Sequence, residues 1–121
     1  MYYTKIAISI HGESAHGSTP HLGKDAIVAA SSVILNAQTL VSRMNNPLKP
    51  LVLTFSGVNG GTQFNIITDL VKLTAYLYAG AASDLTGMQP KLTAICQSTA
   101  AALGCTAELD FGSVCEGGAA E

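Results

Sequence analysis

The order of hydrophobic patterns along the chain is the feature that most constrains its fold. Apolar residues alternate, or β-branched residues are enriched, in four segments that we predict to be strands: residues 5–10, 51–58, 67–79 and 106–111. Two longer segments, residues 25–44 and 83–103, lie between helix start and stop signals and are predicted to be helices. The order strand-helix-strand-strand-helix-strand predicts an α+β fold of the ferredoxin-like type, a two-layer sandwich in which a four-stranded antiparallel sheet carries two helices on one face.

The first predicted helix has an apolar stripe that we expect to face the sheet. The residues of this stripe recur at steps of three and four: Ile27, Ala30, Ile34, Ala37, Val41 and Met44. The opposite side of the helix is not strongly polar, so it can pack on a partner. In the second helix we expect Ser83 or Asp84 at the N-cap, and Pro90 is tolerated if it lies in the first turn.

Length and composition predict one domain that buries part of its surface against something else. A chain of 121 residues fits a single domain, residues 1–121, and the patternless residues 113–121 are predicted to be a linker. Only 12% of the residues are charged, which is about half of the usual fraction of roughly 25%. We therefore expect a homodimer, or contact with another domain of a larger chain.

Net charge and cysteine content limit the binding partners and the cellular location that we expect for the protein. The net charge of -2 gives no reason to expect nucleic acid or a membrane surface as a partner. Three cysteines, Cys96, Cys105 and Cys115, occur without any CxxC spacing, which favours free thiols. Free thiols, and an N-terminus without the order of a signal peptide, predict a cytoplasmic location.

Two polar stretches, residues 11–21 and 59–65, are the candidates for chemistry. All three histidines lie in the first stretch, five residues apart in a loop, and this spacing argues against a metal site. A Ser-His-Asp arrangement would need Ser14 or Ser18 with Asp25, and no nucleophile-elbow pattern supports it. The Gly60-Gly61 pair lacks the spacing of a phosphate-binding loop, so we predict a turn that needs a positive φ angle.

An ordered set of motifs resembles the dimerisation (lid) domain of the M20 family of metallopeptidases and amidohydrolases. It begins with Ile8-x-Ile10-x-Gly12-x-x-x-His16-Gly17-Ser18-x-Pro20-His21. It continues through residues 25–30, 38–43 and 46–48, and resumes at Asn59-Gly60-Gly61-Thr62-x-Phe64-Asn65-Ile66-Ile67-x-Asp69. The resemblance covers about nine tenths of the chain, and its details are most similar to the branch that hydrolyses N-acyl amino acids.

The resemblance implies a role for this chain within a larger enzyme. Such enzymes bind two divalent metal ions, usually zinc, in a separate catalytic domain, so no cofactor is expected in this one. A metal-bridging water attacks the amide carbonyl of a small substrate there. The residue that matches the lid histidine is His16, which would reach across a dimer and stabilise the oxyanion in the partner's site. Asn65, Gly60 and Gly61 match positions that hold the substrate or let the turn approach it.

The sequence also departs from the family. Many relatives carry, near the end of the third strand, an arginine that binds the substrate's carboxylate, and Tyr78 stands there instead. Glycine and proline are usual where Ala75 and Thr68 stand. Because tyrosine cannot form the bidentate charged pair that arginine offers, we expect Tyr78 to allow a substrate without that carboxylate.

Two other functions stay open from the sequence. One is a free-standing ferredoxin-like module that oligomerises or binds a small ligand without enzymatic activity. The other is a small serine hydrolase. The polar loop from Gly12 to His21 favours the hydrolase lid, because a scaffold has no need of it.

Overall fold

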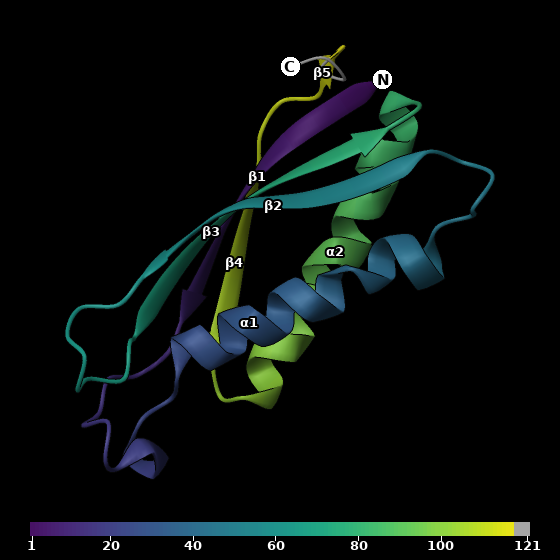
Figure 1. Cartoon of the computed structure of the whole chain (residues 1–121). Coiled ribbons are helices and arrows are strands. Elements are labelled where there is room, and N and C mark those ends of the chain that lie inside the picture. The colour runs from purple at the N-terminus through teal and green to yellow at the C-terminus, as the bar shows by residue number, and fades with distance from the viewer. Residues whose placement is uncertain (118–121) are drawn as a thin grey trace.

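Five antiparallel strands form one sheet in the computed structural model, which describes residues 1–117. Their bounds in chain order are β1 Tyr2–His11, β2 Leu51–Gly60, β3 Leu70–Ala79, β4 Thr106–Phe111 and β5 Cys115–Glu116. The sheet order is β2-β3-β1-β4, and β5 pairs with the beginning of β1. β2 is therefore an edge strand, while β1 and β3 lie in the middle (Figure 1).

Two helices, α1 (Ala26–Ala37) and α2 (Ala82–Ala102), cover one face of this sheet (Figure 1). Two short turns accompany them, the 3-10 turn η1 (Pro20–Leu22) and the π-helical turn η2 (Leu40–Met44). This architecture confirms the predicted α+β sandwich of the ferredoxin-like type. The fifth strand is an addition that the sequence did not predict.

The core lies between the sheet and the helices. Strand alternation sends every second side chain of β1 and β3 inward, so Ile6, Ile8 and Ile10 are buried beside Leu73 and Leu77. The helix α2 contributes side chains at helical spacing to the same core: Leu85, Leu92, Cys96 and Ala100. In the described part of the chain, no helix lies over the opposite face of the sheet, which carries polar and aromatic side chains.

The first helix differs from its prediction in length and in its buried face. It ends at Ala37, and the π-helical turn η2 replaces the rest of the predicted helix. Its buried residues are Ala26, Ala29, Ala30, Val33 and Ala37, whereas Ile27 is 47% exposed and Met44 is 43% exposed. The predicted stripe is thus partly wrong. Small residues let α1 approach α2 and the sheet closely, and this contact outweighs the hydrophobicity of the isoleucine.

The second helix and the third strand also start at other residues than predicted. Ala81 is the N-cap of α2 and offers no side-chain hydrogen bond, while Ser83 and Asp84 lie inside the first turn. Pro90 lies in the helix interior and not in the first turn. β3 begins at Leu70, because residues 66 and 67 pair with another loop instead.

The described end of the chain runs back along β1. Gly112 donates its N–H to the Lys5 carbonyl at 2.8 Å, and Gly117 donates to the Met1 carbonyl at 2.7 Å. The predicted linker, residues 113–121, therefore begins beside the sheet. Residues 118–121 lie outside the described part of the chain, and the linking role remains a prediction.

Residues 26–44 have the length and mean hydropathy, 1.2, of a membrane-spanning helix. The structure gives this segment another role. Its helical part is interrupted at Gln38, and its small-residue face packs on the sheet and on α2. A helix that forms part of a domain core passes the same test of length and composition.

Burial makes the three thiols unequal, although all three are free. Burial raises the pKa of the Cys96 thiol from 9.0 to about 12. It also raises the pKa of Cys105, with the Asp25 carboxylate acting in the same direction. Cys115, in the edge strand β5, is only half-buried.

We expect iodoacetamide to label Cys115 in the native protein long before Cys96. A rise of about three pKa units lowers the thiolate fraction of Cys96 at pH 8 by roughly a thousandfold, and burial blocks access as well. Mass spectrometry of labelled peptides measures this difference, and labelling in denaturant is the control. The neutral buried thiol stabilises the fold below pH 9, and this contribution is lost as the pH rises toward 12. Equal native labelling rates would contradict the burial of Cys96.

Candidate functional site

Two loops meet at the end of the sheet that lies away from both labelled chain ends (Figure 1). The first, residues 12–24, follows β1, and the second, residues 61–69, joins β2 to β3. Gly17 donates its N–H to the Asn65 carbonyl at 2.8 Å, and Ile67 donates to the Ala15 carbonyl at 2.8 Å. These bonds flank a short antiparallel bridge between His16 and Ile66.

The first loop is also fixed at its base. Glu13 and Lys24 exchange two backbone hydrogen bonds of 2.9 Å, and their side chains form an ion pair at 3.5 Å. Gly12 donates to the Asp69 carbonyl at 2.8 Å. A side chain at Gly12 would overlap the Lys24 carbonyl oxygen, so the close approach requires glycine. The long loop is therefore held to its neighbours by backbone bonds at both ends.

His16 is exposed at the centre of this paired region. Its ring atom Nδ1 lies 3.1 Å from the backbone nitrogen of Ser18 and 2.7 Å from the Ser18 hydroxyl. Its carbonyl accepts a hydrogen bond from the Thr19 N–H at 2.9 Å. The backbone is thus fixed by the bridge and the turn, while the imidazole stays open to an incoming group.

The structure brings Asn65, Gly60 and Gly61 to the same end as His16. Asn65 is half-buried, and its carbonyl accepts the bond from Gly17. Gly61 has a φ angle of +104°, which confirms the predicted turn with positive φ. Gly60 passes so close to Val71 that an added Cβ would lie 2.8 Å from its Cγ2.

Tyr78 lies at the other end of the sheet. It pairs with Tyr3 of β1 and Val52 of β2, and its ring centroid is 5.8 Å from that of Tyr3. Along β3 it lies seven positions after Val71, which is a distance of roughly 23 Å at about 3.3 Å per residue. One small substrate cannot contact Tyr78 and His16 of the same chain.

The residues present do not fit a metal ion. Within residues 1–117, no three His, Cys, Asp or Glu side chains come close enough to hold one. His11 faces Glu108 at 3.6 Å on the open face of the sheet, and His21 lies in η1. The loop histidines therefore do not converge.

The geometry also fails to complete a Ser-His-Asp arrangement. Ser18 touches His16, but Asp25 caps α1 instead, with Oδ1 accepting hydrogen bonds from Ile27 at 2.9 Å and Val28 at 3.3 Å. The carboxylate is thus occupied by the first turn of a helix.

Three residues near the site have positions that the sequence did not predict. Ser18 contacts the His16 ring, although it was considered only as a nucleophile. Lys72 and Asp69 line a hollow of about 360 Å³ together with Gly60 and Gly61. Strand alternation places Lys72 on the open face, and this signal could have linked it to the hollow.

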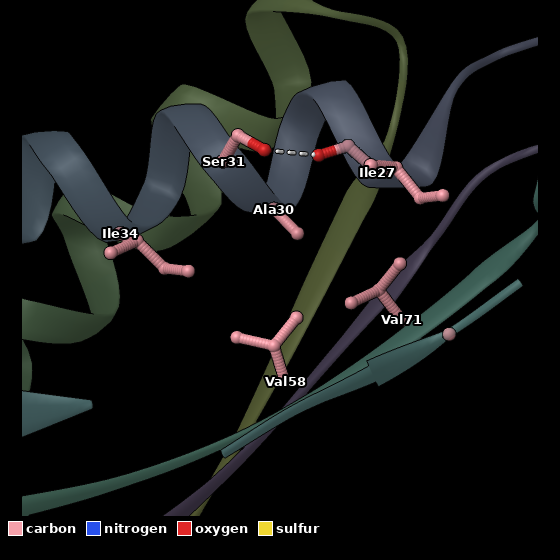
Figure 2. Close-up of a pocket in the computed structure, with 7 residues that line it drawn as sticks. Ile27, Ala30, Ser31, Ile34, Val58 and Val71 are labelled. Carbon is pink, nitrogen blue, oxygen red and sulfur yellow. Dashed lines mark hydrogen bonds between the residues drawn. The ribbon is translucent and has the colours of Figure 1, made fainter. Parts of the chain in front are cut away.

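A smaller, apolar groove separates α1 from the end of β2 (Figure 2). Its volume is about 180 Å³, and Ile27, Ala30 and Ile34 face Val58 and Val71 across it. The Ser31 hydroxyl donates to the Ile27 carbonyl at 2.8 Å, so its polarity is satisfied within the helix. This groove explains the exposure of Ile27 and marks the side of the domain where β2 is the sheet edge.

Comparison with known proteins assigns the family. Residues 3–103 match the model of the peptidase dimerisation domain of the M20 family. The chain belongs to this family. The resemblance predicted from the loop motifs is thereby confirmed, and the matched part of the chain is the dimerisation domain of this family.

Curated relatives include N-acetyldiaminopimelate deacetylases. The one from Anoxybacillus flavithermus is 32% identical over 92% of this chain and 29% of its own length. The one from Bacillus cytotoxicus is 31% identical over 92% of this chain and 30% of its own length. This chain thus spans less than a third of these relatives.

Solved structures show the same domain. A tripeptidase from Staphylococcus aureus is 26% identical, with a TM-score of 0.75 over 92% of this chain and 28% of its own. A dinuclear metal-binding peptidase of the M20 family from Bacillus subtilis shares the fold, with 19% identity and a TM-score of 0.68 over 90% of this chain and 25% of its own.

We expect Gly12→Ala to disrupt the backbone pairing at the base of the first loop. The new methyl group would overlap the Lys24 carbonyl oxygen, so the free energy of unfolding should fall by about 2 kcal/mol or more. Amide hydrogen exchange should accelerate at Glu13 and Lys24. Gly87→Ala is the matched control, because nothing lies within 4 Å of the added Cβ. Gly87 lies in α2, where alanine should stabilise by about 0.5–1 kcal/mol. Equal effects of both substitutions in urea unfolding would contradict this prediction.

Proposed function

We propose that this domain serves an enzyme that hydrolyses the amide bond of an N-acyl amino acid-like substrate, and that it supplies His16 to the active site of the partner subunit. The observation that carries the proposal is the exposed His16 imidazole on a backbone fixed by the bridge to Ile66. The deacetylase names of the curated relatives support the reaction class.

His16 suits the role of a hydrogen-bond donor to the carbonyl oxygen of the scissile amide. Such a donor stabilises the negative charge that develops on this oxygen when a nucleophile attacks. A fixed backbone lowers the entropic cost of placing the imidazole correctly. Asn65, paired with the same turn, is proposed to hold a polar end of the substrate.

This domain lacks the rest of the catalytic machinery in the part described. We propose that two divalent metal ions, zinc being the expected identity, are held by the catalytic domain of the full enzyme. Bound there, such ions would supply the activation of the attacking water. The described residues of this chain provide no set of ligands for them.

The geometry of the sheet supports a contribution in trans. β2 is an edge strand with exposed Val52 and Val58, and the adjacent helix α1 exposes Val28 and Leu35. A twofold axis through this edge would pair two β2 strands antiparallel, since the same surface meets itself in such a dimer. The two α1 helices would then face one another beside the joined sheet.

Antiparallel pairing brings unlike ends of the two subunits together. The Gly60 end of one β2 strand, which carries the His16 loop, would lie near the Leu51 end of the partner strand. Tyr78 lies at this Leu51 end of the sheet. The two described chain ends lie on the same side of the molecule, where the Gly117 N–H donates to the Met1 carbonyl at 2.7 Å. A catalytic domain joined there would receive His16 from the partner and Tyr78 from its own chain.

Subunit mixing in the intact enzyme tests the role of His16. We expect His16→Ala to lower kcat by about two to three orders of magnitude without loss of metal, as for removal of an oxyanion donor. Mixing the His16→Ala subunit with a variant subunit that lacks a catalytic-domain metal ligand should restore about a quarter of the wild-type activity. Half of the dimers are then mixed, and each mixed dimer has one complete site. The absence of any recovery would contradict transfer in trans, and a near-normal rate of His16→Ala would remove the residue from the mechanism.

Substitution of an exposed residue of α1 tests the proposed dimer surface. We expect Leu35→Glu to weaken dimerisation at least tenfold, because a charge would be buried between the two α1 helices. Leu35 is 71% exposed in the single chain, so the folded monomer should tolerate the substitution. Leu103→Glu, at the end of α2, is the control and should leave the dimer intact. Sedimentation equilibrium measures both, and equal dissociation constants would place the interface elsewhere.

A further inference from the structure

The His16 ring has one nitrogen whose hydrogen bonds are fixed by its own turn. The backbone nitrogen of Ser18 lies 3.1 Å from Nδ1, and its N–H points at that atom. The Ser18 hydroxyl oxygen lies 2.7 Å from the same nitrogen. The turn is closed by the bond from the Thr19 N–H to the His16 carbonyl, so Ser18 is held below the ring.

Two groups of Ser18, its backbone N–H and its hydroxyl, together determine which ring nitrogen of His16 carries the proton. A backbone N–H can only donate, so Nδ1 must accept with its lone pair. A neutral imidazole has one protonated nitrogen, and the proton then lies on Nε2. If Nδ1 were protonated instead, two N–H groups would point at one another, and only the Ser18 hydroxyl could still serve as an acceptor.

We infer that Ser18 is a positioning residue that holds His16 in the Nε2–H form, ready to donate to an oxygen atom of the substrate. This inference rests on the proposed function. The opposite tautomer would present a lone pair of Nε2 to the carbonyl oxygen and would repel it. The choice of tautomer thus determines whether His16 can stabilise an oxyanion.

Nitrogen NMR of the intact enzyme with 15N-labelled histidine tests the tautomer directly. The His16 signals are assigned by their loss in His16→Gln. The wild-type ring should show a protonated Nε2 and an unprotonated Nδ1. A protonated Nδ1 in the neutral ring would overturn the inference, whatever the variants do.

Variants of Ser18 test its contribution to turnover. Ser18→Ala keeps the backbone donor and removes the hydroxyl, so kcat should fall about three- to tenfold with KM unchanged, and the Nε2–H population should decrease. Ser18→Thr keeps the hydroxyl and should restore both kcat and the Nε2–H population. Ser14→Ala removes an exposed hydroxyl from the same loop and should change neither.

The outcomes separate this inference from the proposed function. Wild-type kcat and an unchanged ring spectrum in Ser18→Ala, with His16→Ala still impaired, would overturn the role of the Ser18 hydroxyl. A loss of thermal stability in Ser18→Ala without any spectral change would likewise reduce Ser18 to a structural residue. Normal turnover of His16→Ala would instead overturn the proposed function itself.

Discussion

The pairing of the two loops at one end of the sheet is the interaction on which the site depends. Two backbone hydrogen bonds, from Gly17 to Asn65 and from Ile67 to Ala15, join segments that lie about fifty residues apart in the sequence. Without them, His16 would sit in a thirteen-residue loop between β1 and α1 (residues 12–24), where its position would vary. The same bonds bring the polar loop and the glycine turn together, so a sheet that is otherwise a scaffold presents a defined polar end.

The fold was predictable because its signals are local. Alternation in β1 and β3 and the presence of two helices each depend on neighbouring residues, and the order of these elements selects one arrangement. The buried face of α1 was not predictable in this way. Hydropathy predicts that Ile27 rather than Ala29 is buried. Close packing against α2 favours the smaller alanine at the buried face, and only this tertiary contact decides which residue lies there.

The site was predictable only in part, for a related reason. The motif around His16 indicated the residue but not its surroundings. Ile67 continues the apolar pattern of the third strand, so the sequence assigns it to that strand. In the structure its backbone instead bonds to Ala15, and the neighbouring Ile66 pairs with His16. Pairing between distant loops leaves little trace in either segment. The contact from Ser18 to the imidazole depends on one turn conformation, which the sequence permits but does not specify.

The separation of Tyr78 from His16 follows from strand geometry and changes what the replacement of arginine means. Along β3, Tyr78 lies roughly 23 Å from Val71, at the end of the sheet where the His16 loop is found, so the two groups can serve one substrate only if two chains contribute. An antiparallel twofold pairing of edge strands is the arrangement that brings opposite ends together. In such a dimer, under the proposed function, the partner would provide the oxyanion donor, and the chain itself would provide the tyrosine. Substrate preference and catalytic rate would then be controlled from opposite ends of the same sheet, and a substitution at one end need not disturb the other.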